Sequence, residues 1–171
     1  MKTTTTKFIL ALTAFLFILF NTSCQKGDTG TPGQNGTGNI ASRTYTVNTW
    51  AYTSPNHYVN LSVPELTNAN INSCAVMVYF STPNSDSWRA VPFTQYGSLN
   101  NYYMNFNSSI GNVQVTWFSN SSIGIGSNPN DYYSATSQFK VVVIAAALKA
   151  KNADINYQNY SEVKAKFGLK D

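Results

Sequence analysis

The sequence predicts an all-β fold: an antiparallel β-sandwich of about seven or eight strands with a short C-terminal α-helix. Few residues are charged (11%) and many are aromatic (14%), a composition that suits half-buried strands. From residue 43 onward, short runs of alternating apolar and polar residues recur between clusters of Asn, Ser, Gly and Pro. Only residues 154–168 change to a helical spacing.

The first 24 residues predict how the protein is targeted. Lys2 and Lys7 precede a 13-residue run, Phe8–Phe20, that is apolar except for Thr13. The run is shorter than the roughly 18–20 residues of a membrane-spanning helix, so a transmembrane anchor is the weaker alternative. A basic head, a short apolar segment and small residues are typical of a secretory signal peptide. Because Cys24 follows directly, we expect residues 1–23 to be a lipoprotein signal peptide that is cleaved before Cys24, the lipidated residue.

Residues 24–38 predict a tether between the lipid and the folded domain. Glycine recurs at every third position from 27 to 36, which is the spacing of collagen. A run this short with one proline is not expected to form a stable triple helix, so we interpret it as a flexible collagen-like linker. The folded domain is then expected to span residues 39–171.

The strand signal recurs in seven segments of the domain. In 43–53 the alternation changes parity near Trp50, which predicts a bulge or a strand covered on both faces. The run 74–80 is apolar on both parities and predicts a central strand, with Cys74 as a buried, unpaired thiol. We expect a helical turn at 64–72 and a polar loop at 119–131. The seven segments are 43–53, 58–63, 74–80, 88–93, 101–107, 112–118 and 137–148.

The C-terminal segment predicts a helix that packs on the sandwich. Tyr160, Val163 and Phe167 share one helical face. Two lysines lie in the expected last turn, and Gly168 follows where a helix commonly stops.

These features together resemble uncharacterised lipoproteins of the Bacteroidota, in which a short collagen-like linker precedes a β-sandwich. The resemblance implies a fold class and a location at the outer membrane, and it implies no activity. The residues after Cys24 also resemble the surface-export signal of such lipoproteins. The matching residues are Gln25, Lys26, Asp28, Pro64–Thr67, Asn159, Tyr160, Val163, Lys164, Phe167 and Gly168.

Several classes of function find no support in the sequence. Without residues 1–23 the net charge is +2 and the basic residues are scattered, so nucleic acid is not an expected partner. His57 is the only histidine, and no nucleophile, base and carboxylate stand at a catalytic spacing. The Asn/Asp clusters at 84–86 and 128–131 are usual turn chemistry. We therefore expect no enzyme activity, no metal and no cofactor.

Two functions remain as hypotheses. The first is a lipid-anchored, surface-exposed outer-membrane lipoprotein with a non-enzymatic binding or structural role, whose partners are the membrane through Cys24 and an unidentified glycan or protein. The alternative is a glycan-binding lipoprotein that assists polysaccharide capture, which needs two or three exposed rings in one plane. The candidate ligand aromatics are Trp50, Tyr52, Trp88, Tyr132 and Tyr133. We expect most of these rings to point inward and to form no such platform.

Overall fold

A computed structural model describes residues 40–83, 85, 87–98, 100–119 and 127–170. The predicted signal peptide, the tether and Cys24 lie outside the described residues. The described residues belong to one compact unit, 37–171. None of the helices in the described ranges is long and apolar enough to cross a membrane.

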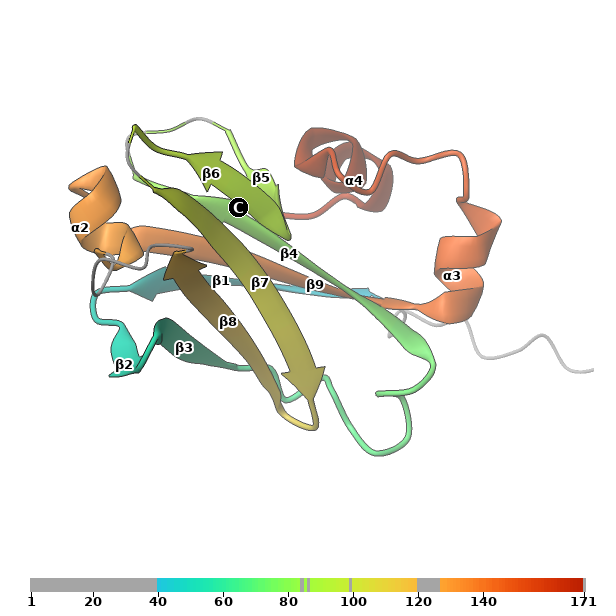
Figure 1. Ribbon diagram of the computed structural model, residues 1–171. Coiled ribbons are helices and arrows are strands. Elements are labelled where there is room, and N and C mark those ends of the chain that lie inside the picture. Colours follow the sequence, from blue (N-terminus) through green and yellow to red (C-terminus); the bar gives the residue numbers. More distant parts are fainter. Residues whose placement is uncertain (1–39, 84, 86, 99, 120–126, 171) are drawn as a thin grey trace, which may run out of the picture. The chain divides into compact units, whose positions relative to one another are not determined.

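Two antiparallel β-sheets form the domain, which confirms the predicted fold class (Figure 1). Sheet A contains, in spatial order, β1 (Ile40–Val47), β9 (Ser137–Ala145), β4 (Cys74–Ser81) and β5 (Arg89–Val91). Sheet B contains, in spatial order, β2 (Ala51–Thr53), β3 (Asn56–Ser62), β8 (Asn112–Ser119), β7 (Asn101–Ser109) and β6 (Phe93–Tyr96).

The described residues contain nine strands because two predicted strands are each divided between the sheets. Segment 43–53 supplies the end of β1 to sheet A and β2 to sheet B, and the change of parity near Trp50 marks this crossing. Both predicted alternatives, a bulge and a single strand covered on both faces, are therefore wrong. Segment 88–93 divides in the same way at Pro92, between β5 and β6. Proline lacks the backbone N–H that a continuing ladder would need, so it suits this break.

The main core lies between the two sheets. Buried side chains alternate along β7 and β8, where Met104, Val113, Val115 and Trp117 are at most 1% exposed. They pack on the inner face of sheet A, which contributes Phe139 and other apolar residues. The alternation in 101–107 and 112–118 predicts six inward residues, and all six lie in or against this core: Tyr102, Met104, Phe106, Val113, Val115 and Trp117. Cys74 is only half buried, at the first position of β4, so the prediction of a buried thiol is wrong.

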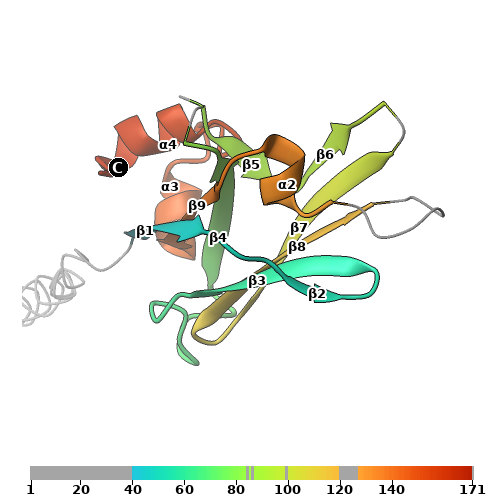
Figure 2. The same cartoon turned by 90° about the vertical axis from the view of Figure 1, so that its left-hand side faces the viewer.

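Two short helices cover the outer face of sheet A. They are α3 (Ala146–Lys151) and α4 (Tyr160–Phe167). In the side view the helices, sheet A and sheet B form three successive layers (Figure 2). A second core lies between the first two layers, where Tyr79, Val142 and Ile144 meet Tyr160 and Val163. Sheet A is therefore apolar on both faces.

The ends of these helices follow local signals. Asn159 precedes α4 and its side chain accepts a hydrogen bond from the backbone N–H of Ser161. Gly168 ends the helix in the left-handed conformation, with φ of 62°, as the sequence predicts. The helix begins at Tyr160, so residues 154–159 lie outside it. The predicted strand 137–148 is too long, because β9 ends at Ala145 and good helix formers follow.

Candidate functional site

The five candidate ligand aromatics do not come together in one place. Trp50 is only 8% exposed. Its ring meets Phe139 edge-on at 5.8 Å, and its Nε1 donates to Asn130 Oδ1 at 3.3 Å. Trp50 is therefore a core residue that is tied to the neighbouring loop.

Tyr132 and Tyr133 lie on a short helix, α2 (Pro129–Tyr133), which begins within the segment 119–131 that is predicted as a loop. Tyr132 packs on Tyr102 at 4.8 Å and Tyr133 on Phe80 at 5.2 Å. Burial raises the pKa of Tyr133 to about 12. Both rings close one end of the main core.

Trp88 belongs to the second core, on the opposite side of sheet A. Its ring lies 5.6 Å from that of Tyr160, and Lys140 Nζ lies 5.1 Å from the centroid of the Trp88 ring. Lys140 is fully buried, and its Nζ donates to the backbone carbonyl of Lys170 at 3.3 Å. Trp88 thus helps to enclose a buried cation and does not face a ligand.

Tyr52 is the one predicted ligand aromatic with a large exposed area, 40%. It stands on the edge strand β2 and contacts the ring of His57 at 4.9 Å. His57 pairs with Trp117 and shares the inward parity of Leu61. Tyr52, which is opposite His57 in the ladder, therefore does not share a face with the outward residues of sheet B.

A different set of aromatic residues lies together on the outer face of sheet B. These rings occupy the parity opposite to the buried residues, and none belongs to either core. We call them the aromatic stripe: Tyr58, Phe118, Tyr103 and Tyr96.

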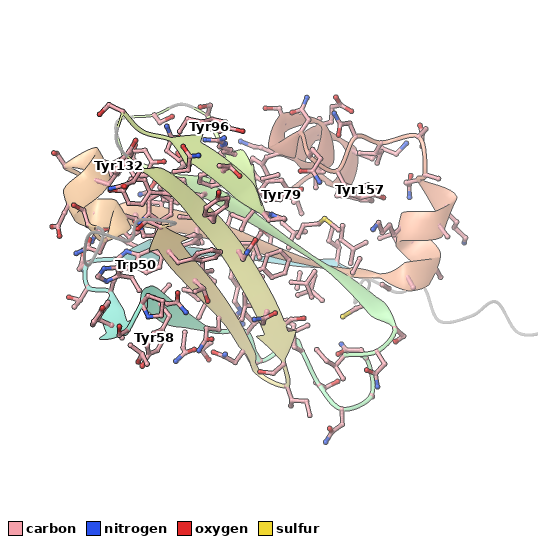
Figure 3. All side chains as sticks on the ribbon, in the orientation of Figure 1. Trp50, Tyr58, Tyr79, Tyr96, Tyr132 and Tyr157 are labelled. Carbon is pink, nitrogen blue, oxygen red and sulfur yellow. The ribbon has the colours of Figure 1, made fainter. Side chains whose placement is uncertain are left out.

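The strand register places the aromatic stripe diagonally across four neighbouring strands. Phe118 and Tyr103 are directly paired between β8 and β7. Tyr58 pairs with Thr116, two residues before Phe118. On the other side Tyr103 pairs with Thr94, two residues before Tyr96. Figure 3 shows Tyr58 at β3 and Tyr96 at β6, on opposite sides of β7 and β8. Diagonal neighbours of this kind are within reach of aromatic side chains.

The rings of the aromatic stripe are open to solvent to different degrees. Tyr96 is 75% exposed, and the other three are half buried. The rings of Tyr103 and Phe118 stack at 5.2 Å with an angle of 19° between their planes. Stacking of this kind restricts both rings, so the centre of the stripe is preorganised.

A polar groove of about 440 Å³ adjoins the Tyr58 end of the stripe. Besides Tyr58, its walls carry only hydroxyl and amide side chains. Gln114 Nε2 donates to Asn60 Oδ1 at 3.0 Å across β8 and β3. The residues that line the groove are Thr53, Ser54, Asn56, Tyr58, Asn60, Gln114 and Thr116.

A row of amides adjoins the Tyr58 end of the aromatic stripe and lies four residues along β8 and β7 from Phe118 and Tyr103. Gln114 pairs with Asn60 on one side and with Asn107 on the other. We call these three residues the amide row. Each amide offers both donors and acceptors, so the row can bond hydroxyl groups in either sense. Aromatic rings beside such amides can bind a ligand that has apolar faces and many hydroxyls.

The sequence contained the signal for this face. The alternation that predicts Tyr102 and Met104 as inward residues makes Tyr103 an outward one. The same reasoning applies to Phe118, next to Trp117, and to Tyr58, next to Val59. An exposed aromatic site is therefore indicated where the alternation expects a polar residue and the sequence has an aromatic one. What the sequence could not supply is the register that places these rings side by side.

Other features of the described residues are less well formed as sites. No group of three or more His, Cys, Asp or Glu side chains that could bind a metal occurs within the described ranges. An open hollow of about 490 Å³ lies between α3 and the start of β4, lined largely by alanines and the ring of Tyr157. Comparisons with protein-family models, with curated proteins and with solved structures found no match to this chain.

Proposed function

We propose that this protein is a lipid-anchored, surface-exposed outer-membrane lipoprotein that binds carbohydrate through the outer face of sheet B. Its role is binding, without catalysis. The observation that carries the proposal is the aromatic stripe, a set of four rings beside amide groups on a sheet face that no described helix or strand covers (Figure 2).

The physical chemistry of this face favours a sugar. A pyranose ring presents C–H groups on its faces, which pack on aromatic rings, and hydroxyls at its edge, which need hydrogen-bond partners. Small-ligand sites combine apolar and aromatic contact area with a few placed polar groups in the same way. Tyr103 and Phe118 supply the contact area, while the next outward pair along β7 and β8, Asn105 and Thr116, supplies donors and acceptors.

A protein partner fits this face less well. The centre of a stable protein–protein interface is apolar and densely packed. On sheet B the rings are separated from other apolar side chains by Asn, Thr and Gln at every neighbouring outward position of β3, β7 and β8. The exposed Ile110 lies at the β7–β8 turn, outside the aromatic stripe.

The carbohydrate proposal is tested with the full-length protein purified in detergent. We expect saturable binding to at least one polysaccharide or glycan in an array, and calorimetry then measures its affinity. Tyr103→Ala and Tyr58→Ala should each weaken binding about tenfold, which corresponds to about 1.4 kcal/mol. Tyr52→Ala is the matched control, because this tyrosine is exposed on another face. The Tyr52→Ala protein should bind the glycan with the affinity of the wild type. Binding that survives both stripe substitutions would contradict the proposed site.

The anchoring proposal is tested in cells through Cys24. Cys24→Ala should abolish metabolic labelling with palmitate and release the protein from the detergent-soluble membrane fraction. Cys74→Ala is the matched control and should keep both properties. Surface exposure predicts that protease added to intact cells degrades the wild-type protein. A Cys24→Ala variant that is still labelled and membrane-bound would exclude lipidation at this residue.

A further inference from the structure

The outer face of sheet B has an unusual chemical composition. Apart from the aromatic stripe and Ala51, its outward positions carry only Asn, Gln, Ser and Thr. Among the described residues, no Asp, Glu, Lys or Arg occupies an outward position of the five strands. Any charged group on a bound ligand would therefore meet no counter-charge on this face.

A charged group that contacts sheet B belongs to Arg89 of β5. Its Nη2 donates to the backbone carbonyl of Thr94 at 2.8 Å, and its Nη1 donates to Gln95 Oε1 at 2.9 Å. The guanidinium also lies 3.9 Å from the centroid of the Phe93 ring, and Phe93 packs on the main core. Arg89 is thus engaged at the inner side of β6 and does not reach across the face.

We infer that the ligand of this face is an uncharged glycan chain, lying across the strands along the aromatic stripe. This inference rests on the proposed carbohydrate function and narrows it. Binding a carboxylate or sulfate would remove water from its charge without supplying a cation, which is unfavourable. Neutral hydroxyls, by contrast, find donors and acceptors in the outward amides next to the rings, Asn60 beside Tyr58 and Asn101 and Asn105 beside Tyr103.

The length of the stripe indicates a chain of several sugars. Neighbouring strands lie about 4.8 Å apart, a spacing close to the length of one pyranose unit. The rings of the stripe stand on four successive strands, from β3 to β6. A glycan chain that crosses the strands therefore meets aromatic rings along several of its sugar units, whereas a single sugar contacts only one or two.

The experiment compares neutral and acidic polysaccharides with the full-length protein in detergent. Affinity electrophoresis uses neutral glucans, mannans and xylans beside polygalacturonate, alginate and heparin. We expect retardation by one or more neutral polymers, with little change between low and high salt. Oligosaccharides cut from the retarding polymer should bind more tightly as they lengthen, by at least tenfold from one sugar unit to four. Tyr103→Ala should abolish the retardation and Tyr52→Ala should leave it unchanged.

The other outcomes distinguish failure of the uncharged, extended ligand from failure of the carbohydrate-binding function. Salt-sensitive retardation by polyanions alone, lost in Tyr103→Ala, would overturn the inference of an uncharged ligand and leave the carbohydrate function intact. A free monosaccharide that binds as tightly as the longer oligosaccharides would overturn the extended chain. Failure of every neutral and acidic glycan to bind would overturn the proposed function itself. Thermal unfolding of each variant shows that the loss of binding is not a loss of fold.

Discussion

Asn130 joins three segments of the sandwich at the end where the chain passes between the sheets. Its Oδ1 accepts hydrogen bonds from Ser137 N at 2.9 Å, from Ser137 Oγ at 2.7 Å and from Trp50 Nε1 at 3.3 Å. Its Nδ2 donates to the carbonyls of Val47 and Asn48 at 2.9 and 3.0 Å. One amide therefore connects the end of β1, the core tryptophan and the start of β9.

We predict that Asn130→Ala lowers the free energy of unfolding by about 2 kcal/mol, because partly buried donors and acceptors lose their partner. Urea denaturation followed by tryptophan fluorescence measures the change. Gln158→Ala, at an exposed position between the helices, is the control and should stay within about 0.5 kcal/mol. Equal stability of the two variants would mean that the Asn130 bonds do not hold this junction together.

A second residue-scale contact predicts a pH dependence. The Arg43 guanidinium bonds both carboxylate oxygens of Glu65, with Nε distances of 2.7 and 2.9 Å. Hydrogen bonding and the charge of Arg43 lower the pKa of Glu65 below its ordinary value of 4.5. Because the folded pKa is the lower one, the pair stabilises the fold above pH 4.5 and this contribution is lost as the pH falls further.

Unfolding midpoints of the wild type and Glu65→Gln should therefore differ most at neutral pH and converge in acid. The effect is modest, because both side chains are partly exposed and solvent screens the pair. Urea titrations between neutral and acidic pH measure it. A difference between the two proteins that is constant with pH would show that the Glu65 charge makes no contribution to stability.

At the scale of elements, α4 packs on sheet A through two buried residues, Tyr160 and Val163. Val163 is 0% exposed in the second core, whereas Phe167 on the same helix face is only half buried. The cost of truncating Phe167 is therefore expected to lie below the 3–5 kcal/mol typical of a fully buried aromatic residue. Val163 is the better probe of how firmly the helix packs on sheet A.

Val163→Ala should cost about 2 kcal/mol, since it removes two buried methyl groups and leaves a small cavity. Lys166→Ala, at an exposed position of the same helix, is the matched control and should be nearly neutral. Chemical denaturation compares both variants with the wild type. If Val163→Ala is as stable as the control, the packing of α4 on sheet A does not contribute to the stability of the domain.

At the scale of the whole domain, the outer faces of the two sheets differ in kind. The outer face of sheet A carries Tyr79, Val142 and Ile144 and is covered by the helical layer. The outer face of sheet B carries rings and amides and has no described element over it (Figure 2). An uncovered apolar face promotes association, whereas isolated rings among amides do not.

We predict that removing residues 146–171 produces a protein that aggregates, because it uncovers the apolar outer face of sheet A. The Cys24→Ala background avoids association through the lipid. Size-exclusion chromatography should show aggregates for the truncated chain. The control is a double variant in the same background, Tyr58→Ala combined with Tyr103→Ala, which changes only sheet B and should be monomeric. A monomeric truncated chain would contradict the structural role assigned to the helical layer.

The local pattern of the sequence was sufficient for the fold class and for most elements. Alternation along Asn101–Asn107 and Asn112–Phe118 depends only on neighbouring residues, so it identifies strands and their buried sides. The same is true of Gly168, because a left-handed helix end favours glycine wherever it occurs. The sequence also supports the prediction of lipidation at Cys24, which lies outside the described residues.

Only the tertiary structure decided which outward residues face each other. The run 74–80 is apolar on both parities, which indicates a strand covered on both faces, but the sequence does not show which strands are neighbours. The crossing near Trp50 and the register of Tyr103 with Phe118 both depend on pairing between segments far apart in the chain. For that reason Trp50, a candidate ligand residue in the sequence, is a core residue in the fold. The aromatic stripe forms only when β3, β8, β7 and β6 pair in this register, which brings together Tyr58, Phe118, Tyr103 and Tyr96.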